Sequence, residues 1–166
     1  MAGIAIRIDI QDEAVRAALD RLGAAAEDLT PAMDEIGDYL TAATQQRFER
    51  GTGPDGKAWP PSIRVQMNQG GKTLMDTGRL VSSITWRAGR DFVEVGTNVI
   101  YAAIHQLGGT IRAKTEKGLK FRIPGVGWRT KASVDIPARP FLGVDEDDRR
   151  EIPEILRDHL APQGVP

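Results

Sequence analysis

The sequence predicts an α+β fold in which an antiparallel or mixed β-sheet carries two N-terminal helices and a C-terminal helix, with one projecting β-hairpin. Three observations support this class. Short segments alternate apolar and polar residues at period two, longer segments place apolar residues at three- and four-residue steps, and strands mostly follow strands. The 166 residues fit one domain, 1–166, in which 1–29 form a peripheral strand and helix.

The first half of the chain predicts a strand and two helices. Residues 3–10 alternate isoleucine with small or polar residues, as strands do, and residues 12–29 change to a helical period. Thr30 and Pro31 then begin a second helix, for which Thr30 is the expected cap and Pro31 suits the first turn. One apolar face of that helix is formed by Met33, Ile36, Leu40, Ala43 and Phe48.

Glycine and proline end this helix. Residues 51–61 hold three glycines and three prolines, which predicts an irregular connection anchored in the core by Trp59. Residues 63–71 form a short helix that ends at the glycines. Residues 78–98 then predict a hairpin with its turn near Gly89.

The second half predicts a short helix, another hairpin and a final helix. Ile100, Ile104 and Leu107 share one face of the short helix, which Gly108 and Gly109 close in the left-handed conformation. Residues 119–136 form the second hairpin, with the sequence PGVG at its tip. Residues 145–160 form a helix with an acidic first turn, which Pro153 either kinks or begins.

Composition excludes several function classes. Lys and Arg total 22 and Asp and Glu total 23, so no bulk charge draws the chain to nucleic acid or to a membrane. Cysteine is absent, which excludes disulfides, thiolate metal sites and a cysteine nucleophile. The N-terminus has neither the pattern of a signal peptide nor that of a membrane span, so synthesis inside the cell is expected.

Asp76-Thr77-Gly78 matches the triplet of aspartic proteases, in which two carboxylates of a homodimer share a proton. Arg79 follows at once and would pair with the Asp76 carboxylate, which opposes proton sharing. The favoured interpretation is therefore a turn or helix start capped by Asp76 or Thr77, and the dimeric protease remains the alternative of another class.

His105 lies four residues after Tyr101, on the same side of the short helix. No nucleophile signature accompanies it, and His159 is far away in sequence, so a metal site is not indicated. We expect Tyr101 and His105 to pack and hydrogen-bond, and we expect neither a cofactor nor a metal. GGKT at residues 70–73 lacks the earlier glycine of a phosphate-binding loop, because that position is Gln66.

Basic residues gather in and before the second hairpin. With the aromatic rings of Phe121 and Trp128 among them, they fit a nucleic-acid backbone, a solvated hairpin, or an arm that meets an acidic face of another subunit such as Asp145–Asp148. The third interpretation is favoured. The basic residues are Arg112, Lys114, Lys117, Lys120, Arg122, Arg129 and Lys131. The subunit-interface candidates are Arg112, Lys114, Lys120, Arg122, Trp128 and Arg129 on the hairpin and Asp145, Glu146 and Asp147 in the acidic run.

Four stretches in this order carry a resemblance to a known family: RFERGTGPDGKAWPP, LMDTGRLVSSI, VGTNVIYAAIHQLGG and IPARPFLGVDEDD. Together they resemble the phage virion morphogenesis family, the tail-completion proteins typified by the G protein of Mu-like phages. Pro153 in the last helix is the one departure.

The resemblance implies a non-enzymatic virion component made in the host bacterial cytoplasm. It implies a subunit that completes the tail or joins it to the DNA-filled head, forms a sixfold ring, and contacts other neck, connector or tail-tube proteins. A tail terminator that caps the tube is the alternative, with passive contact to DNA in the lumen and no membrane. No catalytic residues are carried over. Residues with structural roles are Trp59, Gly78, Tyr101, His105, Gly108, Gly109, Arg139 and Phe141, with Arg139 as a candidate ion-pair residue.

Overall fold

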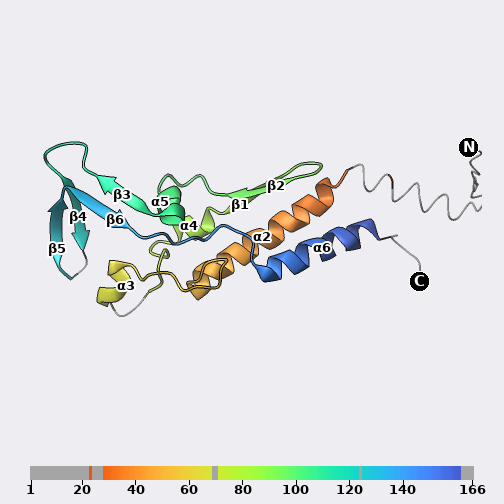
Figure 1. Cartoon of the computed structure of the whole chain (residues 1–166), viewed down its shortest axis with the longest axis horizontal. Coiled ribbons are helices and arrows are strands. Elements are labelled where there is room, and N and C mark those ends of the chain that lie inside the picture. Colours follow the sequence, from red (N-terminus) through yellow and green to blue (C-terminus); the bar gives the residue numbers. More distant parts are fainter. Residues whose placement is uncertain (1–22, 24–27, 69–70, 124, 162–166) are drawn as a thin grey trace, which may run out of the picture.

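The computed structural model describes residues 23, 28–68, 71–123 and 125–161, and it has the expected α+β class. The molecule is elongated, with its two longest helices toward one end and a small β-ladder projecting at the other (Figure 1). The expected N-terminal strand and first helix fall on residues 1–29, which lie almost wholly outside the described residues.

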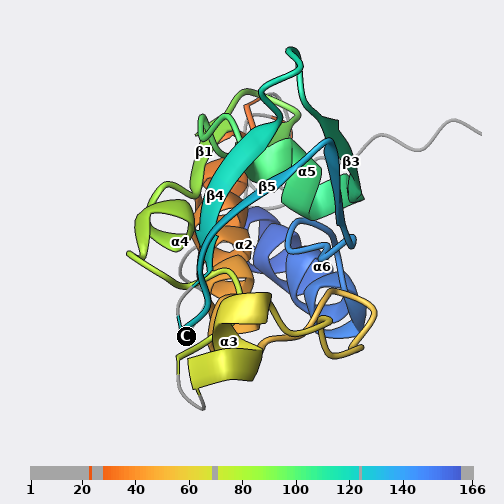
Figure 2. The same cartoon turned by 90° about the vertical axis from the view of Figure 1, so that its left-hand side faces the viewer.

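Two long helices form the layer on which the rest is built. Helix α2 (Thr30–Arg50) and helix α6 (Glu146–Leu160) run antiparallel and side by side in both views (Figures 1 and 2). The expectation that Thr30 caps α2 is wrong. Its amide instead donates to the Asp28 side chain over 3.0 Å, because Thr30 is already the first helical residue. Gly51 ends α2 with φ of 70°, a conformation that glycine adopts without strain.

Helix α6 begins at a complete capping box. Asp145 accepts hydrogen bonds from the amides of Asp147 and Asp148, and Asp148 in turn accepts from the amide of Asp145. The helix continues through Pro153, so this proline neither begins nor ends it.

The first hairpin packs on α2. Strand β1 (Thr85–Ala88) pairs antiparallel with strand β2 (Val93–Gly96), and the turn is closed by the Gly89 amide and the Phe92 carbonyl as expected. Gly37 of α2 lies against the Trp86 ring, because only glycine leaves room for the indole at that point.

Three short helices join these parts: α3 (Ile63–Asn68), α4 (Arg79–Ser82) and α5 (Ala102–Leu107). The expected apolar face of the last one is not buried, since Ile100 is 97% exposed and Leu107 is 77% exposed. The helix begins at Ala102, and so Val99 and Ala102 turn to the core instead.

The remaining strands form two further two-stranded ladders. Strand β3 (Gly109–Arg112) pairs with β6 (Ser133–Ile136), and β4 (Leu119–Ile123) pairs with β5 (Gly127–Lys131). The strands of the described chain are therefore divided among three small antiparallel sheets. We call residues 109–136 the arm; it extends from the body at the opposite end from the free ends of α2 and α6 (Figure 1).

The core lies where α2, the 51–61 connection and the segment after the arm meet. Phe48 packs edge-on to Trp59 at 5.5 Å between ring centroids and tilted against Phe141 at 5.2 Å. Trp59 is 6% exposed, so its predicted role as the anchor of the glycine- and proline-rich connection is confirmed. The rest of the core cluster is Leu80, Ile84, Val99 and Ala102.

Candidate functional site

The segment 137–145 ties the arm to the body. The Gln106 side chain accepts hydrogen bonds from the amides of Phe141 and Leu142 at 2.9 and 3.0 Å and donates to the Leu142 carbonyl at 2.8 Å. Trp59 Nε1 donates to the Pro140 carbonyl over 2.8 Å. An extended segment has no internal backbone partners, so side chains from α5 and the 51–61 connection satisfy it.

Arg139 lies within this segment and connects it to α5 and to the 51–61 connection. Its amide donates to the His105 carbonyl over 2.7 Å, and its Nε donates to the Pro60 carbonyl over 2.6 Å. Arg139 is 5% exposed, and burial lowers its pKa. The expectation of an ion pair is wrong, because the guanidinium is satisfied by backbone carbonyls.

Arg47 makes the corresponding connection to α6. Its guanidinium donates to the Gly143 carbonyl at 2.8 Å and to Asp145 at 2.9 Å, and it also binds Asp148. The sequence analysis did not predict a role for Arg47, because a charged residue is not expected on the buried, apolar face of a helix. The signal that could have found it is the acidic run that follows the segment, which supplies the opposite charge.

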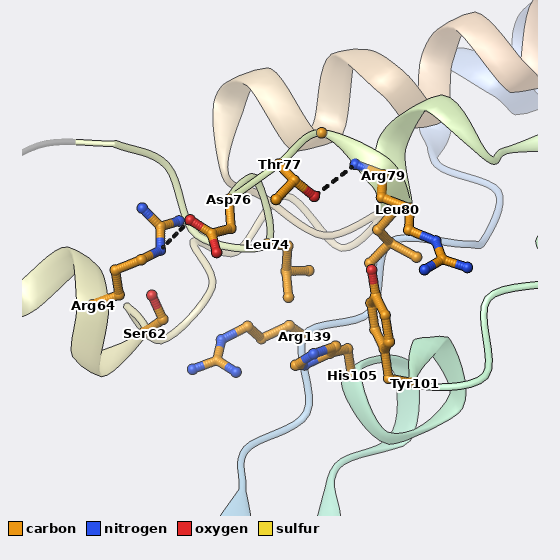
Figure 3. Close-up of a pocket in the computed structure, with 11 residues that line it drawn as sticks. Ser62, Arg64, Leu74, Asp76, Thr77, Arg79, Leu80, Tyr101, His105 and Arg139 are labelled. Carbon is orange, nitrogen blue, oxygen red and sulfur yellow. Dashed lines mark hydrogen bonds and ion pairs between the residues drawn. The ribbon is translucent and has the colours of Figure 1, made fainter. Parts of the chain in front are cut away.

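A hollow of about 540 Å³ opens beside Arg139 (Figure 3). It brings together the Asp76-Thr77-Gly78 triplet and the pair of Tyr101 and His105. Its walls are formed by residues in and next to α3, by α4 and the turn before it, by residues in and next to α5, and by the segment 137–145. The labelled lining residues are Ser62, Arg64, Leu74, Asp76, Thr77, Arg79, Leu80, Tyr101, His105 and Arg139.

Asp76 is placed as a surface residue. Its side chain is 75% exposed and lies 3.4 Å from Arg64 Nε, so the expected pairing with Arg79 is wrong. Thr77 Oγ1 accepts from the Arg79 amide at 3.4 Å, and Gly78 takes φ of 77° just before α4. This is the turn that the sequence favoured, and it is unlike the enclosed carboxylate pair that proton sharing needs.

His105 and Tyr101 lie together as expected, with their rings edge to face and 5.9 Å between centroids. Burial, with a smaller effect of the Arg139 charge, lowers the pKa of His105. Its Nδ1 is buried without a hydrogen-bond partner. Within the described ranges, no group of three or more His, Cys, Asp or Glu side chains could hold a metal. Gly108 follows with φ of 70°, and a Cβ there would lie 2.7 Å from the Ala138 amide, so a larger residue would push this segment away.

The arm carries all the basic candidates on exposed positions. Lys120 and Arg122 lie on β4, Arg129 lies on β5, Arg112 lies at the end of β3, and Lys114 lies in the connection between β3 and β4. Trp128 is 62% exposed, with Lys120 Nζ 5.1 Å from its ring centroid. A large aromatic side chain at a projecting tip is typical of a contact surface.

The acidic run is only partly free. Asp145 and Asp148 bind Arg47, whereas Glu146 and Asp147 lie at the surface and pair within α6 with Arg149 and Arg150. Half of the run is therefore structural, and the interface role of the rest stays a prediction.

The model for the phage virion morphogenesis family matches residues 10–161. The chain belongs to this family. It is 36% identical over 156 residues to the Mu-like prophage FluMu G protein 2 of Haemophilus influenzae, covering 93% of this chain and 96% of that one. It is 33% identical over 156 residues to the putative capsid assembly protein G of Escherichia phage Mu, covering 89% of this chain and 88% of that one. No solved structure matches the chain.

Membership in the phage virion morphogenesis family assigns the chain a structural or morphogenetic role in a phage and associates it with the virion. Across the part of the chain that the structure describes, none of the helices is long and apolar enough to span a bilayer. In this virion morphogenesis protein, the four stretches that carried the resemblance meet around the core and the hollow of Figure 3. All four contribute to the core, and side chains or carbonyls of the first and third stretches hydrogen-bond the segment 137–145 at the base of the arm.

Proposed function

We propose that this protein completes the tail of a phage at the neck, where copies of it form a ring that joins the tail to the head. The observation that carries the proposal is the arm. It projects from the body and exposes a large aromatic ring and open strand edges, and it is anchored at its base by partly buried hydrogen bonds.

An arm of this kind is not built to stand alone. An isolated two-stranded ladder is marginally stable in water, and an open edge offers unpaired backbone groups to another chain. Among the described elements, each arm strand makes extensive contact only with its partner strand. A neighbouring subunit would supply the missing contacts, and a ring supplies one neighbour for every copy.

The relatives support a role in building the particle, since one of them is named a putative capsid assembly protein. A sixfold ring is proposed because it matches the symmetry of a phage tail. In this function the protein works by binding, and its partners are copies of itself together with connector or tail-tube proteins.

Deletion of the gene from a phage that encodes it tests the proposal. Electron micrographs of the lysate should show filled heads and separate tails, and a plasmid copy of the gene should restore joined particles. Normal infectious virions without the gene would contradict the proposal.

The same micrographs distinguish the proposed joining ring from the second candidate, a tail terminator. Loss of a joining ring leaves tails of normal length without heads, whereas loss of a terminator changes the length of the tails. The exposed Trp128 fits either position, so tail length is the deciding measurement.

A further inference from the structure

The charges of the chain are separated between its two ends. The arm, residues 109–136, holds seven Lys and Arg against two Asp and Glu, a formal charge of +5. The helical layer of α2 and α6, residues 30–50 and 145–160, holds five Lys and Arg against eleven Asp and Glu, a formal charge of −6. The net charge of −1 conceals this separation.

The two charged regions do not neutralise one another within one copy. Among the described residues, no ion pair involves a lysine or arginine of the arm. The arm and the free ends of the two long helices point to opposite ends of the molecule (Figure 1). The opposite charges therefore do not meet within one copy, and they are available for contacts with another molecule.

The acidic side of the layer is a defined stripe on α6. Asp147, Glu151, Glu154 and Asp158 follow one another at steps of four, three and four residues, which places them on one face of the helix. All four residues are exposed. Asp147 and Glu154 pair within α6 with Arg150 and Arg157, so the arm would have to compete with these exposed pairs.

The positive charge of the arm lies on both faces of the β4–β5 ladder. Lys120 and Arg122 alternate along β4, and Arg129 and Lys131 alternate along β5, with all four residues exposed. Strand alternation places residues i and i+2 on the same face, and directly paired residues share a face. The register pairs Arg122 with Trp128 and Arg129 with Phe121, so the positive row of β4 shares its face with Trp128, whereas the row of β5 lies on the other face of the ladder. Trp128 beside Lys120 adds apolar area to the contact.

We propose that the basic arm of one copy docks on the acidic α6 stripe of the next copy, so that the ring closes through head-to-tail contacts between opposite charges. This inference rests on the proposed ring function and names its two surfaces. Because each copy carries one surface of each kind, the contact is heterologous, as a closed ring requires. The stripe keeps Asp147 of the expected Asp145–Asp148 run as a partner of the arm and omits Asp145 and Asp148, because these two carboxylates bind Arg47.

A nucleic-acid strand fits the observations less well. It would account for the charge of the arm but would leave the −6 of the helical layer without a partner, and it would be repelled by that layer. A ring of copies gives a partner both to the basic arm and to the acidic helical layer.

Charge exchange between two variants of the full chain tests the contact. The arm-reversed variant carries Lys120→Glu, Arg122→Glu, Arg129→Glu and Lys131→Glu. The helix-reversed variant carries Asp147→Lys, Glu151→Lys, Glu154→Lys and Asp158→Lys. A matched control reverses four exposed basic residues outside the arm with Lys57→Glu, Lys72→Glu, Arg79→Glu and Arg87→Glu.

Each variant is supplied from a plasmid to the deletion phage, and the purified protein is followed by sedimentation velocity. We expect each reversed variant alone to lose at least tenfold in infectious particles and to lose its oligomer, while the control keeps both. Supplied together, the two reversed variants should restore particles, because the arm of each then meets the opposite charge on the other in an alternating ring. Raising the salt from about 0.05 to about 0.5 M should weaken the wild-type contact, since added ions screen exposed charges.

Several outcomes would overturn the proposal. If the arm-reversed variant assembles alone, or if the mixture fails although both variants melt as the wild type does, the two surfaces do not meet. Loss of DNA binding in the arm-reversed variant, with no restoration by mixing, would assign the arm to nucleic acid. These results leave the proposed function intact as long as the wild-type plasmid restores particles, so the two failures are distinguishable.

Discussion

Arg47 and Asp148 form a buried ion pair that joins the two long helices, with their side chains 4% and 1% exposed. Asp145 and the Gly143 carbonyl bind the same guanidinium, so a single arginine fixes the start of α6 and the end of the segment behind the arm. This contact explains why an arginine occupies the buried face of α2. Its charge is compensated where it lies, and the carboxylates that compensate it also cap the next helix.

Replacement of Arg47 should therefore be costly. Arg47→Ala leaves the buried Asp148 carboxylate without its partner, and we expect a loss of about 3–5 kcal/mol in the free energy of unfolding. Chemical denaturation measures it. Arg87→Ala is the matched control, because the Arg87–Glu94 pair has side chains 71% and 63% exposed and should contribute less than about 1 kcal/mol. Equal effects of the two variants would contradict the account of Arg47.

Acid should weaken the cap of α6. Burial alone would raise the pKa of Asp145, but the Asp148 amide, the Arg47 side chain and the Asp147 amide together hold it below its ordinary value of 3.8. A carboxylate with a lowered pKa stabilises the fold above the unfolded pKa, and this contribution is lost as the pH falls through the folded pKa. The stability difference between the wild type and Asp145→Asn should thus be constant at neutral pH and shrink below pH 3.8. Asp91→Asn, in the exposed turn between β1 and β2, is the control for loss of a carboxylate.

His105 should make stability depend on pH in a higher range. Its pKa is lowered by burial and by Arg139, so the neutral form is favoured in the fold. Its contribution is complete above the ordinary pKa of 6.5 and is lost as the pH falls below that value toward the folded pKa. His105→Gln should remove this slope from thermal melts recorded between about pH 5 and about pH 8. His159→Gln should leave the slope in place, and a slope that survives in His105→Gln would exclude the assignment.

Gly37 should resist a substitution that helix propensity favours. Alanine in a helix interior is preferred over glycine by about 1 kcal/mol, but a Cβ at this position would lie 2.0 Å from Trp86 Cδ1. We expect Gly37→Ala to destabilise the fold by about 1–3 kcal/mol through overpacking. In a Trp86→Ala background the same change should become neutral or stabilising, and a double-mutant cycle of unfolding free energies measures the difference. A penalty that persists without the indole would show that the ring is not its cause.

Asp76 should be dispensable for any chemistry. Its carboxylate is mostly exposed and lies beside Arg64, so Asp76→Asn should change stability by less than about 1 kcal/mol and leave the yield of infectious particles unchanged. Plaque counts from the complemented deletion phage measure this. A loss of particles accompanied by uncleaved phage proteins would instead revive the aspartic protease interpretation.

The sequence by itself determined the elements that depend on local patterns. The helical period of residues 30–50, the alternation on either side of Gly89 and the glycine- and proline-rich connection anchored by Trp59 all predicted what the structure contains. These features depend on residues within one or two turns of each other, and a single sequence records them directly. The basic hairpin could be predicted for the same reason, because its two strands are adjacent in sequence.

Only the tertiary structure decided which distant groups meet. Arg47 reaches Asp148 across 101 positions of sequence, and Arg139 bonds the Pro60 carbonyl where an ion pair was expected. Partners this far apart in sequence are brought together by the packing of the fold. A periodic pattern in a single sequence reports only on residues that are close in sequence, so it does not reveal them. The separation of charge was present in the order of residues along the sequence, but it became two surfaces only when the fold placed the arm and the helical layer toward opposite ends of the molecule.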